Sequence, residues 1–174
     1  MRLNFRNAVA FCLLIALSFA GPIARAQEKQ PAKIKASAIQ IMMIRADEVT
    51  LPAEFQVSLY ENLINQLQKK SVFPHVYRDG DRNAATAPDL IALQCTVESF
   101  KKGSETMRQV TTVAGKTFMT LRCRFRDKSG NVLLERKIEG KVRFFGGNLK
   151  ATQDFATKAA NVAEENFSPV AGGA

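Results

Sequence analysis

The chain has 174 residues, 46% of them hydrophobic and 24% charged, with a formal net charge of +9 at pH 7. This balance is typical of a globular domain and excludes an intrinsically disordered chain. The length suits a single domain. The chain has one histidine, so a zinc site with several histidine ligands is not expected, and any histidine-dependent catalytic triad would have to use that residue.

Residues 1–26 have the pattern of a secretory signal peptide. Two arginines in MRLNFR precede the apolar run AVAFCLLIALSFAG, which is too short to span a bilayer comfortably. Small residues at Ala24 and Ala26 predict cleavage between Ala26 and Gln27. Cys12 lies inside the apolar run instead of opening the mature chain, so no lipid anchor is expected. We therefore expect a periplasmic or secreted protein, in a compartment where disulfides persist.

The first part of the mature chain predicts a strand, a helix and a second strand. Residues 27–33 are polar and are expected to form a flexible leader. The apolar run at 34–44, IKASAIQIMMI, predicts a strand that is central in a sheet. Residues 50–71 predict an amphipathic helix, because apolar residues recur on one face. Residues 72–78 predict a short strand, and Pro74 within it favours a sheet edge.

The second part predicts three strands and a helix. Glycine, proline and small residues at 79–88 indicate a loop. The resulting order, β-α-β-β-β-β-α, predicts an α+β fold over residues 34–167, with a mixed sheet and both helices on one face. The predicted strands are 90–100, 117–127 and 131–145, followed by a helix at 148–167 and a disordered tail at 168–174.

Cys95 and Cys123 lie near the middle of two of these strands. Alternation places each of them on an apolar face. An antiparallel hairpin can oppose them, and a register shifted by two residues keeps the same faces but separates them. The pairs in the favoured register are Cys95–Cys123, Val97–Leu121 and Phe100–Phe118.

Two states of these cysteines remain open at this stage: a structural disulfide and two buried free thiols. A catalytic dithiol is not expected, because the pair lacks the Cys-x-x-Cys spacing and apolar surroundings raise the pKa of a thiol.

A second hairpin is predicted around DKSG, residues 127–130, taken as a four-residue loop. In this register apolar residues face apolar residues across the two strands, and one basic residue faces an acidic one. The predicted pairs are Cys123–Leu134, Met119–Ile138 and Arg122–Glu135.

Two stretches resemble ligand-binding loops but lack residues that such loops need. VTTVAGKT, residues 110–117, ends like a phosphate-binding loop, but Val110 replaces its first glycine and the stretch leads into a strand instead of a helix. DGDRN, residues 79–83, spaces its polar residues as a calcium loop does, but the sixth and twelfth positions are Ala84 and Leu90. We therefore expect no metal or other cofactor.

A stripe of basic residues is the strongest binding feature in the sequence. Arg122, Arg124 and Arg126 share the polar face of one predicted strand, and Lys141 and Arg143 share that of the next. The stripe suits a polyanion, anionic lipid headgroups or an acidic partner. The alternative is a solvated sheet face, since glutamates dilute the charge. The glutamates are Glu98, Glu135 and Glu139.

The arrangement of elements resembles a bacterial family called domain of unknown function 4410. The resemblance covers nearly all of residues 34–167. Its markers are LPAEFQVSLYENLINQL, VFPHVYRDGD, PDLIALQCTVESFKKGS and LRCRFRDKSGNVLLERKIEG, followed by an alanine-rich helix. The resemblance implies an exported envelope protein without an established active site. Relatives often carry a lipid anchor, and this chain departs from them by lacking the lipid-bearing cysteine.

These observations together favour a non-catalytic binding or assembly accessory of the bacterial envelope. Its partner would be an envelope protein or an anionic surface, and nucleic acid is not expected because few aromatic residues lie among the basic ones. Two alternatives remain: a hydrolase or thiol-dependent enzyme with an unrecognised site, and a binder of anionic polymers or lipid headgroups through the arginine face.

Overall fold

The computed structural model describes residues 32–110, 115–142 and 146–170. The predicted signal peptide, its cleavage site between Ala26 and Gln27, most of the leader, and Arg143 lie outside these residues. In the part of the chain that is described, no helix combines the length and apolar character that crossing a membrane requires.

The described residues form a mixed sheet of five strands, β2 (Ala38–Ile41), β3 (His75–Arg78), β4 (Leu90–Lys101), β5 (Thr117–Arg126) and β6 (Val132–Val142). Their order is β3-β2-β4-β5-β6, so β3 lies at an edge, as Pro74 predicts. β2 runs parallel to β3 and β4, whereas the β4–β5 and β5–β6 pairs are antiparallel. The α+β class with a mixed sheet is therefore confirmed.

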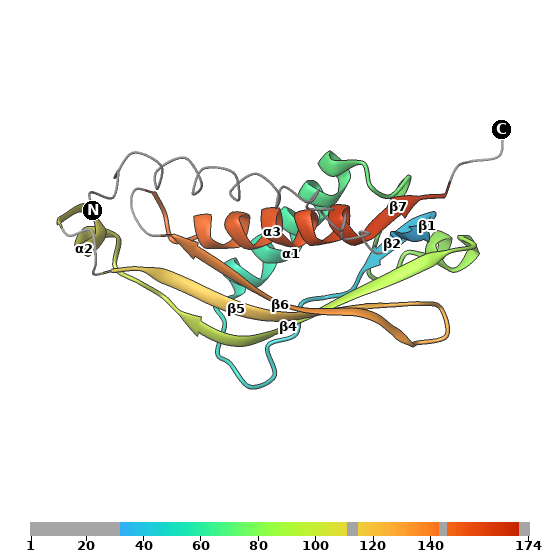
Figure 1. Cartoon of the computed structure of the whole chain (residues 1–174). Coiled ribbons are helices and arrows are strands. Elements are labelled where there is room, and N and C mark those ends of the chain that lie inside the picture. Colours follow the sequence, from blue (N-terminus) through green and yellow to red (C-terminus); the bar gives the residue numbers. More distant parts are fainter. Residues whose placement is uncertain (1–31, 111–114, 143–145, 171–174) are drawn as a thin grey trace, which may run out of the picture. The chain divides into compact units, whose positions relative to one another are not determined.

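Two helices, α1 (Ala53–Lys70) and α3 (Lys150–Asn166), cover one face of this sheet (Figure 1). The apolar stripe of each helix points to the strands, and burial of this surface from water drives the packing. Two small residues of α3, Ala156 and Ala159, are fully buried. The α1 stripe matches the sequence pattern and consists of Phe55, Leu59, Tyr60, Leu63, Ile64 and Leu67.

A second, two-stranded sheet joins the beginning and the end of the fold. β1 (Ile34–Ala36) pairs in parallel with β7 (Phe167–Pro169), and the two labels lie together in Figure 1. The single strand predicted over 34–44 is therefore divided at Ser37, and only its second part, β2, has the interior position expected. Ser168 and Pro169, which were assigned to a disordered tail, belong to β7.

The β4–β5 register agrees with the cysteine prediction in its first part and departs from it after a β-bulge. Cys95 opposes Cys123, and Val97 opposes Leu121, as predicted. The ladder then shifts between Val97 and Ser99, so Phe100 opposes Met119 and not Phe118. The extra residue returns Phe100 to the helix-covered face, where its ring contacts Phe55 at 4.8 Å between centroids.

The predicted β5–β6 register is wrong by two residues. Cys123 opposes Arg136, Met119 opposes Gly140 and Arg122 opposes Lys137. The loop has five residues instead of four, because the Asp127 carboxylate accepts hydrogen bonds from the backbone and side chain of Asn131, both at 2.9 Å. A further register shift follows between Phe125 and Arg126. A shift of two residues preserves the faces, so Ile138 is still buried.

Two short elements do not appear in the sequence prediction. A 3₁₀ helix, η1 (Arg82–Thr86), lies in the predicted loop between β3 and β4. A six-residue helix, α2 (Glu105–Val110), lies between β4 and β5. Both are too short to show a helical period in the sequence.

Candidate functional site: the open face of the sheet

The sheet face turned away from α1 and α3 is polar, and we call it the open face. Alternation along β5 sends Arg122 and Arg124 to this face, while Leu121 and Cys123 are fully buried beneath the helices. The connection between β2 and α1 passes on the side away from the helices (Figure 1).

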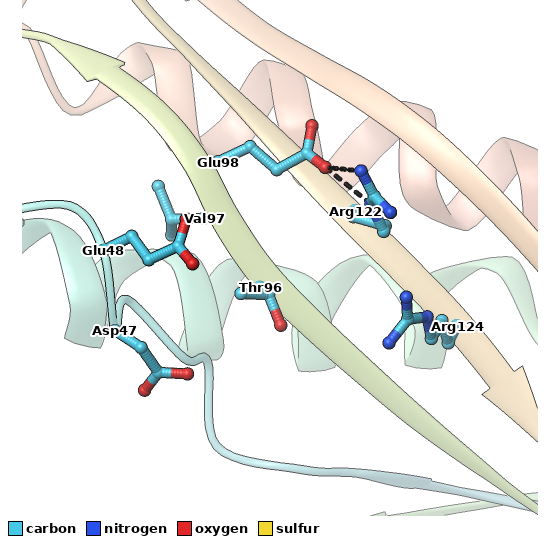
Figure 2. Close-up of a pocket in the computed structure, with 7 residues that line it drawn as sticks. All are labelled: Asp47, Glu48, Thr96, Val97, Glu98, Arg122 and Arg124. Atoms are coloured by element: carbon cyan, nitrogen blue, oxygen red, sulfur yellow. Dashed lines mark hydrogen bonds and ion pairs between the residues drawn. The ribbon is translucent and has the colours of Figure 1, made fainter.

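The open face contains a hollow of about 280 Å³ (Figure 2). Arg122 and Arg124 lie on one side of Thr96, and carboxylates of the β2–α1 connection lie on the other. The connection is held over β4 because Arg45 forms a parallel bridge with Thr96. The lining residues are Asp47, Glu48, Thr96, Val97, Glu98, Arg122 and Arg124.

Charged side chains on this face form an alternating network of ion pairs. Glu98 accepts a hydrogen bond from Arg122 Nε at 2.5 Å and pairs with Lys137 Nζ at 2.8 Å. Glu135 accepts a hydrogen bond from Arg124 Nε at 2.5 Å and lies 3.7 Å from an Arg122 nitrogen. The cations are therefore offset by carboxylates, in line with the alternative in which glutamates dilute the basic charge of this face.

The β4 bulge explains how Glu98 reaches two cations. Glu98 is the residue without an opposing partner between Val97 and Ser99, and a bulge of this kind redirects a side chain relative to its neighbours. The Glu98 side chain is only 20% exposed, which makes it the least exposed member of the network.

Neighbouring cations lower the pKa of both glutamates. Hydrogen bonds from Lys137 and then Arg122 lower the pKa of Glu98 below its ordinary value of 4.5. The hydrogen bond from Arg124 is the main cause that lowers the pKa of Glu135. Both carboxylates are thus ionised at neutral pH.

The structure places the predicted binding residues at different positions. Only Arg122 and Arg124 meet at the hollow. Arg126 donates a hydrogen bond to the Gly130 carbonyl at 3.1 Å, in the β5–β6 turn. Lys141 lies near the other end of β6, opposite Phe118. Arg143 lies outside the described residues.

Asp47 and Glu48 line the hollow but are not among the sequence-predicted residues. They lie in a connection whose course depends on long-range pairing between Arg45 and Thr96. No local sequence pattern predicts this pairing, so the position of Asp47 and Glu48 is known only from the fold.

Cys95 and Cys123 form a disulfide on the helix-covered side of the sheet, which decides between the two states left open by the sequence. The Cys95 carbonyl accepts the Arg45 N–H at 3.0 Å, so its backbone groups face away from β5. Cys95 and Cys123 are then a non-hydrogen-bonded pair, the kind with the closest side chains. Their Cα atoms are 4.1 Å apart. Both residues are fully buried, as expected of a structural link.

The calcium-like stretch has structural roles. The Asp79 carboxylate accepts the Met43 N–H at 2.9 Å. The Asp81 carboxylate accepts the Asn83 N–H at 2.9 Å and caps η1. Among the residues that the structure describes, no group of three or more histidine, cysteine, aspartate or glutamate side chains is placed to hold a metal ion.

The phosphate-loop-like stretch continues into a strand, as the sequence predicts. Thr117 enters β5 and not a helix. Its hydroxyl donates to the Asn148 side chain at 2.5 Å and accepts the Gly103 N–H at 3.0 Å. Residues 111–114 of this stretch lie outside the described residues.

Comparison with known proteins places the fold but not the family. The chain matches no protein-family model, and no curated protein matches it. Two structures of the PelC dodecamer from Paraburkholderia phytofirmans are similar to it. A point variant of PelC has 14% identity and a TM-score of 0.56, covering 77% of this chain and 93% of that chain. The other structure has 16% identity and a TM-score of 0.54, covering 74% and 89%.

A third similar structure is a hypothetical protein from Chlamydia trachomatis, with 10% identity and a TM-score of 0.48, covering 74% of this chain and 97% of that chain. At the identities of the two PelC structures, the comparison establishes a shared fold and nothing further about this chain.

Proposed function

We propose that this chain is an exported, non-catalytic assembly module of the bacterial envelope, related to the family called domain of unknown function 4410, and that its open face binds another protein. The chain is released from its signal peptide after Ala26 and carries no lipid anchor. The buried disulfide supports an oxidising compartment.

The ion-pair network is the observation that supports a protein partner best. A fixed pattern of alternating charges selects a surface with the complementary pattern and rejects others. A polyanion instead needs unpaired cations, and Arg122 and Arg124 are each paired with a glutamate. The network therefore favours a protein over an anionic polymer at this face.

The enzyme alternative finds less support. Glu98, which lines the hollow, has a lowered pKa, whereas a general acid needs a raised one. The thiol-dependent version is disfavoured because Cys95 and Cys123 are joined and fully buried. Similarity in fold to PelC, which forms a dodecamer, makes a second copy of this chain one eligible protein partner.

Site-specific photo-crosslinking in the periplasm tests this proposal. A photoreactive residue replaces Thr96 in the hollow, and the matched control replaces Thr157, which is exposed on the helix side. We expect Thr96 to give a discrete crosslinked species, and a product of twice the chain mass would identify a second copy.

The intact mass of the same material tests the compartment. We expect a chain that starts at Gln27 and takes up an alkylating reagent only after reduction. The absence of crosslinks from Thr96, or equal crosslinks from both positions, contradicts the open face as the binding surface.

A further inference from the structure

Figure 1 shows α2 beyond the ends of β4 and β5, and exposed apolar residues occur on α2 and next to residues that contact it or are joined to it by hydrogen bonds. Val110 is 77% exposed and Met107 is 46% exposed, both on α2. Phe118, near the start of β5, and Leu149, just before α3, are each 39% exposed. Large apolar side chains grouped at one place on a surface indicate an interaction site.

The buried Arg108 side chain holds these elements together. Its guanidinium donates to the carbonyl oxygens of Gly115 at 2.6 Å and Gly146 at 2.9 Å, and to the side chain of Asn148 at 2.9 Å. Gly103 packs so tightly that a Cβ atom there would lie 2.1 Å from the Gly115 carbonyl oxygen. α2 is therefore fixed against both neighbouring segments and presents its apolar residues in a preorganised way.

Lysines lie next to these apolar residues in the chain or in the strand register. Phe118 lies in register between Lys101 of β4 and Lys141 of β6. The acidic neighbours among the described residues are engaged: Glu105 accepts the Asn148 N–H at 2.9 Å, Glu54 pairs with Lys102 at 3.3 Å, and Asp154 accepts the Lys141 N–H at 2.9 Å. The lysines are Lys101, Lys102, Lys116, Lys141 and Lys150.

The chemistry of this rim favours lipid over protein. Lysine is depleted at protein–protein interfaces, where arginine and aromatic residues are enriched. Lysine stems instead lie along an apolar surface while their ammonium groups reach anionic headgroups. Buried apolar area and electrostatic attraction together set binding at a bilayer interface.

We propose that this end of the molecule docks on an anionic lipid bilayer. The side chains of Met107, Val110, Phe118 and Leu149 enter the headgroup region, and the five lysines contact the lipid phosphates. We call these nine residues the lysine-rimmed end. This surface is separate from the hollow, so the proposal does not depend on the proposed function of the open face.

Vesicle co-sedimentation tests the proposal with the chain as recovered from the periplasm. We expect binding to phosphatidylcholine vesicles that contain phosphatidylglycerol, little binding to phosphatidylcholine alone, and weakening as salt is added. Replacing Met107 and Val110 by aspartate should lower binding at least tenfold. Each of Lys101→Gln and Lys141→Gln should lower it about fivefold.

Two matched controls separate this end from the rest of the surface. Val57→Asp changes an apolar residue of α1 that is 62% exposed, and Arg122→Gln with Arg124→Gln removes cations of the open face. Both should bind vesicles like the parent chain. The substituted residues at the lysine-rimmed end are surface residues, and circular dichroism checks that each variant folds.

Three results would overturn the proposal: no binding to anionic vesicles, equal binding to neutral and anionic vesicles, or loss of binding in the controls but not in the lysine-rimmed-end variants. Capture of a protein through this end without vesicle binding would assign it to a protein partner and would equally overturn it.

Discussion

Glu98 illustrates how a single residue organises the open face. The bulge in β4 leaves it without an opposing residue, and its carboxylate then joins Arg122 of β5 to Lys137 of β6. Three strands are thus linked by one side chain that is largely shielded from solvent. Because exposure to water weakens ion pairs, this shielded position should make Glu98 the most influential member of the network.

The lowered pKa of Glu98 predicts a pH dependence of stability. A carboxylate with a lowered folded-state pKa stabilises the fold above its unfolded pKa and loses this effect as pH falls through the folded value. We therefore expect Glu98→Gln to be less stable than the parent chain at pH 7, with the difference shrinking as pH falls below 4.5. Thermal unfolding at several pH values measures this.

Glu48→Gln is the matched control for this pH series, because Glu48 lines the same hollow but is exposed and has no ion pair among the described residues. Its midpoint should follow the parent chain at every pH. If the midpoint of Glu98→Gln also equals that of the parent chain at every pH, Glu98 does not stabilise the fold.

At the scale of elements, α3 protects part of the edge strand β6. The Asp154 carboxylate accepts the Lys141 N–H at 2.9 Å, and Lys158 Nζ donates to the Glu139 carbonyl at 2.9 Å. These backbone groups point away from β5, so side chains of α3 satisfy them in place of a further strand. An uncovered edge strand can pair with a strand of another chain. The contact with α3 prevents such pairing over the second half of β6.

The close approach of α3 to β6 requires Gly140. A Cβ atom at this position would lie 2.3 Å from the Ala151 carbonyl oxygen and 2.7 Å from the Phe155 Cβ. We expect Gly140→Ala to lower the free energy of unfolding by about 1–3 kcal/mol, because overpacking forces the helix away from the sheet. Urea unfolding measures this change.

Glu139→Ala serves as the control for Gly140→Ala, since the exposed Glu139 side chain is not part of the helix contact and only its carbonyl is bonded. It should change stability little. Equal effects of the two substitutions would show that α3 can adjust to a side chain at position 140.

Sequence patterns predict the faces of these elements better than their registers. Alternation correctly buries Cys95 and Val97, because period and burial are local properties of a strand. The spacing of three between Val97 and Phe100 breaks this alternation and is a signal of the bulge that the prediction missed. The β5–β6 register fails because it depends on the Asp127 hydrogen bonds, which no periodicity encodes.

The candidate site is predictable to a smaller extent. Strand alternation identifies Arg122 and Arg124 as residues of the polar face. The sequence also places glutamates near these arginines, but which arginine pairs with Glu98 and which with Glu135 depends on the bulge and on the β5–β6 shift and does not follow from the sequence. The lysine-rimmed end also requires the fold, because its members are distant in the chain.

At the scale of the whole molecule, the core continues from the main sheet into the β1–β7 ladder. Phe167 of β7 is 1% exposed, and its ring lies 5.1 Å from that of Phe125 in β5 and 5.6 Å from that of Phe73. The last residues of the fold are therefore part of its core, and they do not form a loose extension.

This position predicts a large effect for Phe167→Ala. We expect a loss of about 3–5 kcal/mol in the free energy of unfolding, the usual cost of removing a buried phenylalanine ring. Chemical denaturation measures it, with Phe118→Ala as the exposed phenylalanine control. A cost no greater than that of Phe118→Ala would contradict a role for β7 in the core.

The parallel pairing of β1 with β7 also constrains the order in which the fold can be completed. A ribosome makes β1 first among the strands and β7 last, so Ile34 has no opposing Phe167 until almost the whole domain has been synthesised. Closing such a long loop is slow compared with forming a hairpin such as β4–β5. The β1–β7 ladder is therefore expected to form late, after the main sheet that it joins is in place.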